Sequence, residues 1–256
     1  MQKQNVKLNL QYDGTNYHGW QRQDNANSIQ ETIEKIISNI SKEDVTVVGC
    51  SRTDTGVHAL NFVCNFITSR LDICSEKWKC ALNALLPADI RVINSQFVDI
   101  DFNSRFDAIS KTYLYKIQNS KVQNPILRNY CCLFRPKLDL KLIKEASQIF
   151  VGSHDFLSFT NNDPNRSLMN SVREIYEIKI NKIDDIDDIL EFTIVGNAFL
   201  YKMIRILVGT LLYVGCNKIK IQEIKHILES KDRRFAGFTA PAHGLYLYEV
   251  KFDSYK

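Results

Sequence analysis

Short strand-like segments alternate with amphipathic helical segments along this chain, and that alternation limits its fold more than any other feature. A strand predicted at 6–12 runs into Asp13-Gly14, which is a turn signal. Ser28 then fits a helix N-cap with Glu31 three residues later, and isoleucines recur at helical spacing as far as Ile40. Because short strands and helices follow one another in both halves, we predict an α+β fold whose two similar halves build a largely antiparallel sheet.

The same criteria predict the remaining elements. Further strands are expected at 45–49, 60–66, 90–99, 111–118, 171–181, 190–195 and 246–252, and further helices at 76–86, 140–151, 198–213 and 222–230. The two halves meet near 103–109, so we expect two domains, 1–104 and 105–256.

Composition excludes some classes of protein and only weakly favours others. A net charge of +4 suits a polyanionic partner without requiring one, so any binding surface must be a local patch. The seven cysteines are odd in number and contain no C-x-x-C pair, which indicates reduced thiols in the cytoplasm rather than disulfides or a zinc site. The segment 199–214 is apolar but is interrupted by Lys202 and Arg205, so we expect no membrane span.

Two elements suggest chemistry when they are considered together. The loop 51–59, SRTDTGVHA, is the densest polar cluster between two apolar strands, although Asp54 ahead of Gly56 fits an ordinary turn. The predicted helix at 198–213 is apolar on nearly every side, and it surrounds Arg205 with apolar neighbours. An arginine there requires a carboxylate partner. That partner is either any of the 29 acidic residues, in a purely structural salt bridge, or Asp54, in a functional one. In the second case the arginine would lower the pKa of the Asp54 carboxyl by about 1–3 and keep it ionised.

The loop resembles the catalytic motif of the tRNA pseudouridine synthase A family, in which the aspartate of an R-T-D-x-G-V-H-A stretch is the nucleophile. Four other stretches resemble the family in the expected order. They are 12–23 (YDGTNYHGWQRQ), 105–115 (RFDAISKTYLY), 196–209 (GNAFLYKMIRILVG) and 240–247 (APAHGLYL). Ser51 and Thr55 depart from the usual glycine and alanine. Lys111-Thr112 replaces a more arginine-rich pair, which puts a phosphate contact in doubt.

The resemblance implies two ferredoxin-like or RRM-like halves and an isomerase that converts uridine to pseudouridine at positions 38, 39 and 40 of the tRNA anticodon stem-loop. It implies no cofactor, no metal, a cytoplasmic homodimer and tRNA as the partner. The implied site residues have distinct roles. Asp54 is the nucleophile, Arg205 its ion-pair partner, Tyr113 the stacking and proton-transfer group, Arg52 and Leu245 parts of the substrate site, and His58 an organiser of the loop.

Candidate RNA contacts and rival functions complete the sequence hypotheses. Arg22, Arg105 and Arg166, with Arg233-Arg234 as further candidates, suit phosphates, although each alone is typical of a solvated surface charge. One rival is a metal-dependent RNA hydrolase with Asp54, His58, His154 and Asp155 as ligands. The other rival is a non-catalytic RNA-binding module, in which Asp54 would be dispensable.

Overall fold

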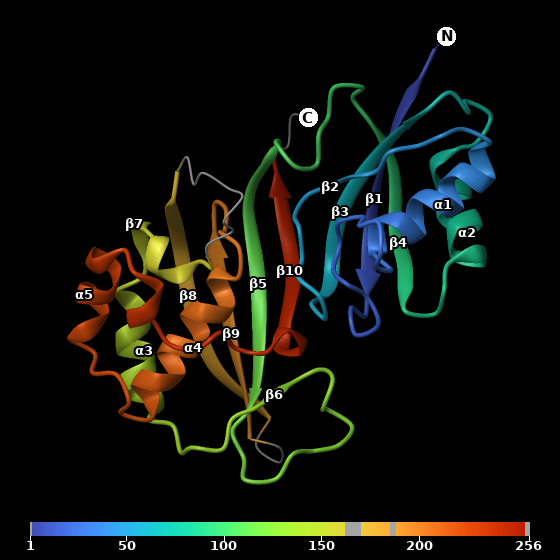
Figure 1. Cartoon of the computed structure of the whole chain (residues 1–256). Helices are drawn as coiled ribbons and strands as arrows, with labels where there is room; N and C mark the ends of the chain where they lie inside the picture. The colour runs from blue at the N-terminus through green and yellow to red at the C-terminus, as the bar shows by residue number, and fades with distance from the viewer. Residues whose placement is uncertain (1, 162–169, 185–187, 254–256) are drawn as a thin grey trace. The chain divides into compact units, whose positions relative to one another are not determined.

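A computed structural model describes residues 2–161, 170–184 and 188–253, and it is a mixed α+β structure (Figure 1). Two compact units make up the chain. Unit 1 consists of Met1–Lys111 together with Tyr246–Lys256, and unit 2 consists of Thr112–Leu245. No helix among the described residues is long and apolar enough to cross a membrane.

The sheet of unit 1 is centred on β1 (Gln4–Tyr12). It pairs antiparallel with β4 (Ile90–Val98) on one side and with β3 (His58–Thr68) on the other. The short β2 (Val48–Gly49) also pairs with β3, and β10 (Leu245–Phe252) joins β3 in parallel through Tyr246 and His58. The last strand of the chain therefore completes the sheet that the first strand begins.

Two helices cover the apolar side of this sheet. The helix α1 (Ile29–Ser41) begins where Ser28 accepts a hydrogen bond from the Glu31 amide, and α2 (Ser75–Leu85) follows β3. Trp78 of α2 meets the edge of Phe66 of β3 at a ring separation of 5.1 Å. The core that supports the unit is formed by the fully buried residues of these elements: Leu8, Leu10, Ile29, Ile33, Ile37, Phe62, Phe66, Trp78 and Leu82.

A buried pair of asparagines holds the segment 99–104 against the same sheet. The Asn65 amide donates to Asn5 Oδ1 at 3.1 Å and to the Phe102 carbonyl at 3.2 Å, and Asn65 Oδ1 accepts from the Ser104 amide at 2.9 Å. The Asn5 amide donates to the Phe102 carbonyl at 2.9 Å. Because both asparagines are buried, these bonds satisfy polar groups that would otherwise be costly to remove from water.

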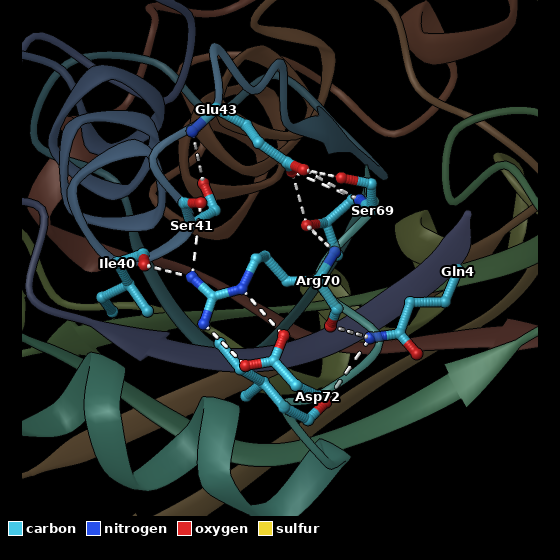
Figure 2. Close-up of polar contacts among 9 residues, drawn as sticks. Gln4, Ile40, Ser41, Glu43, Ser69, Arg70 and Asp72 are labelled. Atoms are coloured by element: carbon cyan, nitrogen blue, oxygen red, sulfur yellow. Dashed lines mark hydrogen bonds and ion pairs between the residues drawn. The ribbon is translucent and has the colours of Figure 1, made fainter. Parts of the chain in front are cut away.

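Arg70, just beyond β3, closes the C-terminal end of α1 (Figure 2). Its Nη1 donates to the carbonyls of Ile40 and Ser41 at 3.1 and 3.4 Å, and its other nitrogens form a bidentate pair with Asp72. A cation at this end of a helix also opposes the partial negative charge of the last carbonyls. The Glu43 carboxylate holds the segment after β3 by accepting hydrogen bonds from both the amide and the hydroxyl of Ser69.

The strands of unit 2 lie in the order β5 (Ala108–Gln118), β9 (Ile189–Gly196), β8 (Val172–Asp184) and β7 (Gly152–Asp155). The pairs β8–β9 and β7–β8 are antiparallel, whereas the short β6 (Cys132–Leu133) runs parallel to β5. The α-helices are α3 (Leu140–Gln148), α4 (Met203–Gly215) and α5 (Glu223–Ser230). Three short 3-10 helices lie at Leu157–Phe159, Arg233–Phe235 and Ala242–Gly244.

The predicted α+β class with largely antiparallel pairing is confirmed, and most predicted elements are present within a few residues. The start of the helix predicted at 198–213 was wrong. The helix begins at Met203 because Lys202 adopts a left-handed conformation with φ of 58°, which interrupts the helical backbone. His154 and Asp155, which the metal-dependent rival would use as ligands, lie in β7.

Candidate functional site

The loop that carries Asp54 is a tight turn between β2 and β3. The Val57 amide donates to the Asp54 carbonyl at 3.1 Å, and Gly56 supplies the positive φ of 77° that this turn needs. Thr53 and Val57 are buried on either side, whereas Asp54 is half-buried. The backbone on both sides is thus anchored, while Asp54 as a residue is only half-buried.

A second loop, residues 13–20, holds the Asp54 loop in place. The Trp20 amide donates to the Thr53 carbonyl at 3.1 Å, and the Gly56 amide donates to the Tyr17 carbonyl at 3.3 Å. The hydroxyls of Tyr12 and Thr53 share a hydrogen bond of 2.9 Å. Two bonds therefore fix the backbone on either side of Asp54 and a third holds the Thr53 side chain, which is how a reacting group is held in one position.

Two glycines make this close contact possible. A Cβ atom on Gly19 would lie 2.4 Å from the Thr53 carbonyl oxygen, and one on Gly14 would lie 2.0 Å from the Val57 carbonyl oxygen. Gly19 also has a φ of +90°, which disfavours any L side chain. The two loops can approach so closely only because neither position carries a side chain.

Lys111 of β5 anchors the root of the Asp54 loop. Its Nζ donates to the Cys50 carbonyl at 2.6 Å, one residue before the loop begins. The sequence suggested only a weakened phosphate contact at this position. The bond to Cys50 gives Lys111 a positioning role that the sequence did not reveal.

His58 follows the loop and is buried under Tyr246, with ring centroids 4.8 Å apart. Its Nδ1 lies 3.1 Å from the Gly14 amide nitrogen and 3.1 Å from Asp13 Oδ1. The first contact needs a lone pair on Nδ1 and the second needs a proton there, so only one of the two is a hydrogen bond at a time, depending on whether Nδ1 carries a proton. In either state His58 links the loop at 13–14 to β3.

The remaining candidate residues of the active site lie in unit 2. Arg205 is half-buried in the first turn of α4, where its Nε donates to the Ala240 carbonyl at 2.7 Å and its own carbonyl accepts from the Ala240 amide at 3.0 Å. Tyr113 is buried in β5 and meets the edge of Phe199 at a ring separation of 5.4 Å. Leu245 is buried at the start of β10. Arg205 lies in a helix as expected, but this helix begins at Met203, so Tyr201, which is 47% exposed, lies outside it.

The arginines proposed to contact RNA differ in their surroundings. Arg52 and Arg105 are exposed, and the Arg105 guanidinium lies 5.3 Å from the centre of the Phe106 ring. Arg22 lies 3.7 Å from the buried Glu34 carboxylate, so it has an intramolecular partner. Arg166 lies outside the described residues.

The pair Arg233-Arg234 also has internal partners. Arg233 donates to Asn161 and Thr239 side chains, and Arg234 forms an ion pair with Asp232 at 2.6 Å.

In the part of the chain that the structure describes, no group of three or more His, Cys, Asp or Glu side chains could hold a metal ion. His154 Nε2 lies 3.1 Å from the Val151 carbonyl. Asp155 pairs with Lys231 at 2.8 Å, and its hydrogen bonds to Lys231, Ser171 and Leu157 outweigh burial and lower its pKa. Both residues thus have structural partners.

Comparison with known proteins places these features in a family. The family model described as tRNA pseudouridine synthase matches residues 10–107 and 146–253, which include the Asp54 loop, its supporting loop, and Arg205. The chain belongs to the tRNA pseudouridine synthase family. The predicted family resemblance is confirmed.

Curated relatives in this family match over nearly the full length. A protein of Acetivibrio thermocellus named tRNA pseudouridine synthase A is 46% identical over 248 residues, which cover 97% of this chain and 99% of that protein. Proteins of Clostridium tetani and Clostridium acetobutylicum with names of the same kind are each 47% identical, again over 97% of this chain and 99% of each relative.

Proposed function

We propose that this member of the family isomerises uridine to pseudouridine in the anticodon stem-loop of tRNA, at positions 38, 39 and 40, with Asp54 as the nucleophile. The observation that carries the proposal is the Asp54 loop itself. Asp54 is half-buried, the Trp20–Thr53 and Gly56–Tyr17 hydrogen bonds fix the backbone around it, and the Tyr12 hydroxyl holds the Thr53 side chain. A rigid frame around a half-buried aspartate suits a group that must attack one atom of a bound nucleotide.

The reaction needs no second substrate. The N1–C1′ bond of uridine breaks, the uracil turns within the site, and a C5–C1′ bond forms while the proton on C5 leaves and N1 gains one. Asp54 would start the process by adding either to C1′ or to C6, and it departs in the last step. Atoms and electrons balance without a cofactor.

Each remaining candidate residue has a proposed part in that sequence. Arg205 supplies the positive charge that keeps Asp54 ionised. Tyr113 stacks on the uracil, and its hydroxyl assists removal of the C5 proton. A base–aromatic stack contributes about 1–3 kcal/mol, which helps to offset the few kcal/mol needed to extrude a base from its helix. Leu245 forms an apolar wall of the base pocket, and His58 orders the Asp54 loop. Arg52 either fills the space that the extruded base leaves in the stem or binds the phosphate of that nucleotide. The family resemblance supports these roles, and it also supports a cytoplasmic homodimer.

Release of tritium tests the proposed reaction. Purified protein is incubated with tRNA transcripts labelled with tritium at C5 of uridine, because forming the new carbon–carbon bond must release that tritium to water. We expect release that chelators do not affect. Folded protein that releases none from any tRNA would overturn the proposal, and release abolished by a chelator would favour the metal-dependent rival.

Replacing the target uridines tests the proposed position. A tRNA whose residues 38, 39 and 40 are all cytidine should release no tritium, whereas a tRNA with uridine restored at one of them should release it again. Equal release from both transcripts would contradict the assignment to the anticodon arm and leave the isomerase proposal intact.

A further inference from the structure

The stretch between Asp107 and Asp139 is basic without interruption. It contains no aspartate or glutamate, although acidic and basic residues are nearly balanced in the whole chain, at 29 and 33. Its cations are Lys111, Lys116, Lys121, Arg128, Arg135 and Lys137. Lys111 is committed to the Cys50 carbonyl, and Lys116 lies 3.9 Å from Glu191. The other four lie on one segment, 119–137, which we call the basic loop.

All four cations of the basic loop are exposed, and none forms an ion pair with a carboxylate among the described residues. Elsewhere exposed cations commonly have an acidic neighbour, as Lys35 has Glu31, Lys231 has Asp155 and Arg234 has Asp232. The basic loop is therefore a local concentration of unneutralised positive charge in unit 2.

The loop has a defined backbone that holds these charges in place. The Asn119 amide donates to the carbonyls of Phe134 and Pro136, both at 2.8 Å, and Gln118 Oε1 accepts from the Asn124 amide at 2.9 Å. The Tyr130 and Cys131 amides both donate to the Leu127 carbonyl at 2.9 Å. Figure 1 shows residues 119–131 as the light-green excursion between β5 and β6, and the parallel pairing of these two strands closes its base. Little ordering is thus needed on binding, which favours affinity.

Apolar side chains stand among the cations. Val122 and Ile126 are each 76% exposed, and Tyr130 is 41% exposed. Cations alternating with exposed apolar and aromatic groups suit a nucleic acid, since phosphates pair with the charges while sugars and base faces pack on the apolar groups.

We propose that the basic loop, residues 119–137, is a docking surface for the phosphate backbone of tRNA outside the reacting nucleotide. The inference rests on the proposed function, because it takes tRNA as the substrate. The occupant is a polyanion rather than a second copy of this chain. The loop carries four cations and no carboxylate, so the same loop on a second copy would offer these cations no acidic partner. Docking of this kind contributes affinity for any tRNA and no selection of the target base.

Salt dependence of tRNA binding tests the proposal. Each phosphate contact contributes about 0.7–0.9 to the slope of log affinity against log salt, so four contacts contribute about 3. We expect the quadruple variant Lys121→Gln, Arg128→Gln, Arg135→Gln, Lys137→Gln to lose a slope of about 3. Between 50 and 200 mM salt, wild-type affinity should then fall about 60-fold more than the affinity of the variant. Its rate of tritium release at saturating tRNA should stay within about twofold of wild type, because no group at the reacting base has changed.

The matched control neutralises four lysines that already pair with a glutamate, of which Lys35, Lys179 and Lys251 are exposed and Lys79 is half-buried. It should change the slope by less than about 1. An unchanged slope in the basic-loop variant would overturn the proposal. If the slope stays unchanged and the variant also shifts from dimer to monomer, the loop is instead an interface between copies of this chain. If wild type binds tRNA with the steep slope but releases no tritium, the proposed reaction fails while the docking surface stands.

Discussion

Replacing Gly19 with alanine should displace the Asp54 loop. The new Cβ would lie 2.4 Å from the Thr53 carbonyl oxygen, whereas ordinary van der Waals contact begins at 3.4 Å. Because that oxygen belongs to the residue before Asp54, the loop must retreat by about 1 Å to relieve the clash, and the Trp20–Thr53 hydrogen bond is lost.

The expected loss follows from that displacement. Misplacing a reacting group by about 1 Å lowers a rate by roughly 10²-fold, which corresponds to about 2.7 kcal/mol of transition-state stabilisation. The φ of +90° adds a separate strain of about 1–2 kcal/mol to folding. We therefore expect Gly19→Ala to fold with reduced stability and to lose roughly 10²-fold in kcat/KM for tritium release from tRNA.

Gly152→Ala is the matched control. Gly152 also has a positive φ, +103°, but the nearest atom to its added Cβ is His154 Nε2 at 3.8 Å, so it tests the same backbone strain without the clash. It should lose a similar amount of stability and keep kcat/KM within about twofold of wild type. The reasoning is refuted if Gly19→Ala retains the wild-type rate, or if the two variants lose activity equally.

Further variants test other contacts. Asn65→Leu leaves Asn5 Oδ1 and the Ser104 amide without their buried partner and removes one of the two bonds to the Phe102 carbonyl. It should lower the free energy of unfolding in urea by about 3–5 kcal/mol. Asn9→Leu, which loses one part-buried bond, should lower it by about 1 kcal/mol, and similar values for both would contradict this. The Arg70 hydrogen bonds lower the pKa of the Asp72 carboxyl from 3.8 to about 2, so the pair stabilises the fold fully above pH 3.8 and is lost as pH falls towards 2. The melting temperature of wild type should therefore drop more over this window than that of Asp72→Asn, and parallel curves would speak against the pair. Lys111→Met should lower kcat about tenfold with KM for tRNA nearly unchanged, and Lys111→Arg should recover part of it; a raised KM alone would instead indicate a phosphate contact.

Local signals in the sequence predicted much of the fold. The strand before Asp13-Gly14, the helix behind Ser28 and the helix that ends before Pro87 all appear as β1, α1 and α2, because each has its own periodicity and its own start or stop residue. The Asp54 loop was also visible, since polar residues between two apolar strands stand out.

Contacts between distant segments were not predictable in the same way. The apolar run before Met203 continues the helical pattern without a breaker, so nothing local announces the left-handed Lys202. The short β6 and β7 carry too few residues for a pattern, and the parallel pairing of β10 with β3 leaves no trace in either strand. The close approach of Gly19 to Thr53 and the bond from Lys111 to Cys50 depend on tertiary packing, which single residues do not reveal.

Single-turnover tritium release by Asp54→Ala tests the central claim most directly. With enzyme in excess over labelled tRNA, wild type should release one tritium for each target uridine. The variant should release none while binding tRNA with an affinity within about twofold of wild type, because only the nucleophile has been removed. Release by the variant at a rate within about tenfold of wild type would contradict the account, since the carboxylate at position 54 would then not be the group that begins the reaction.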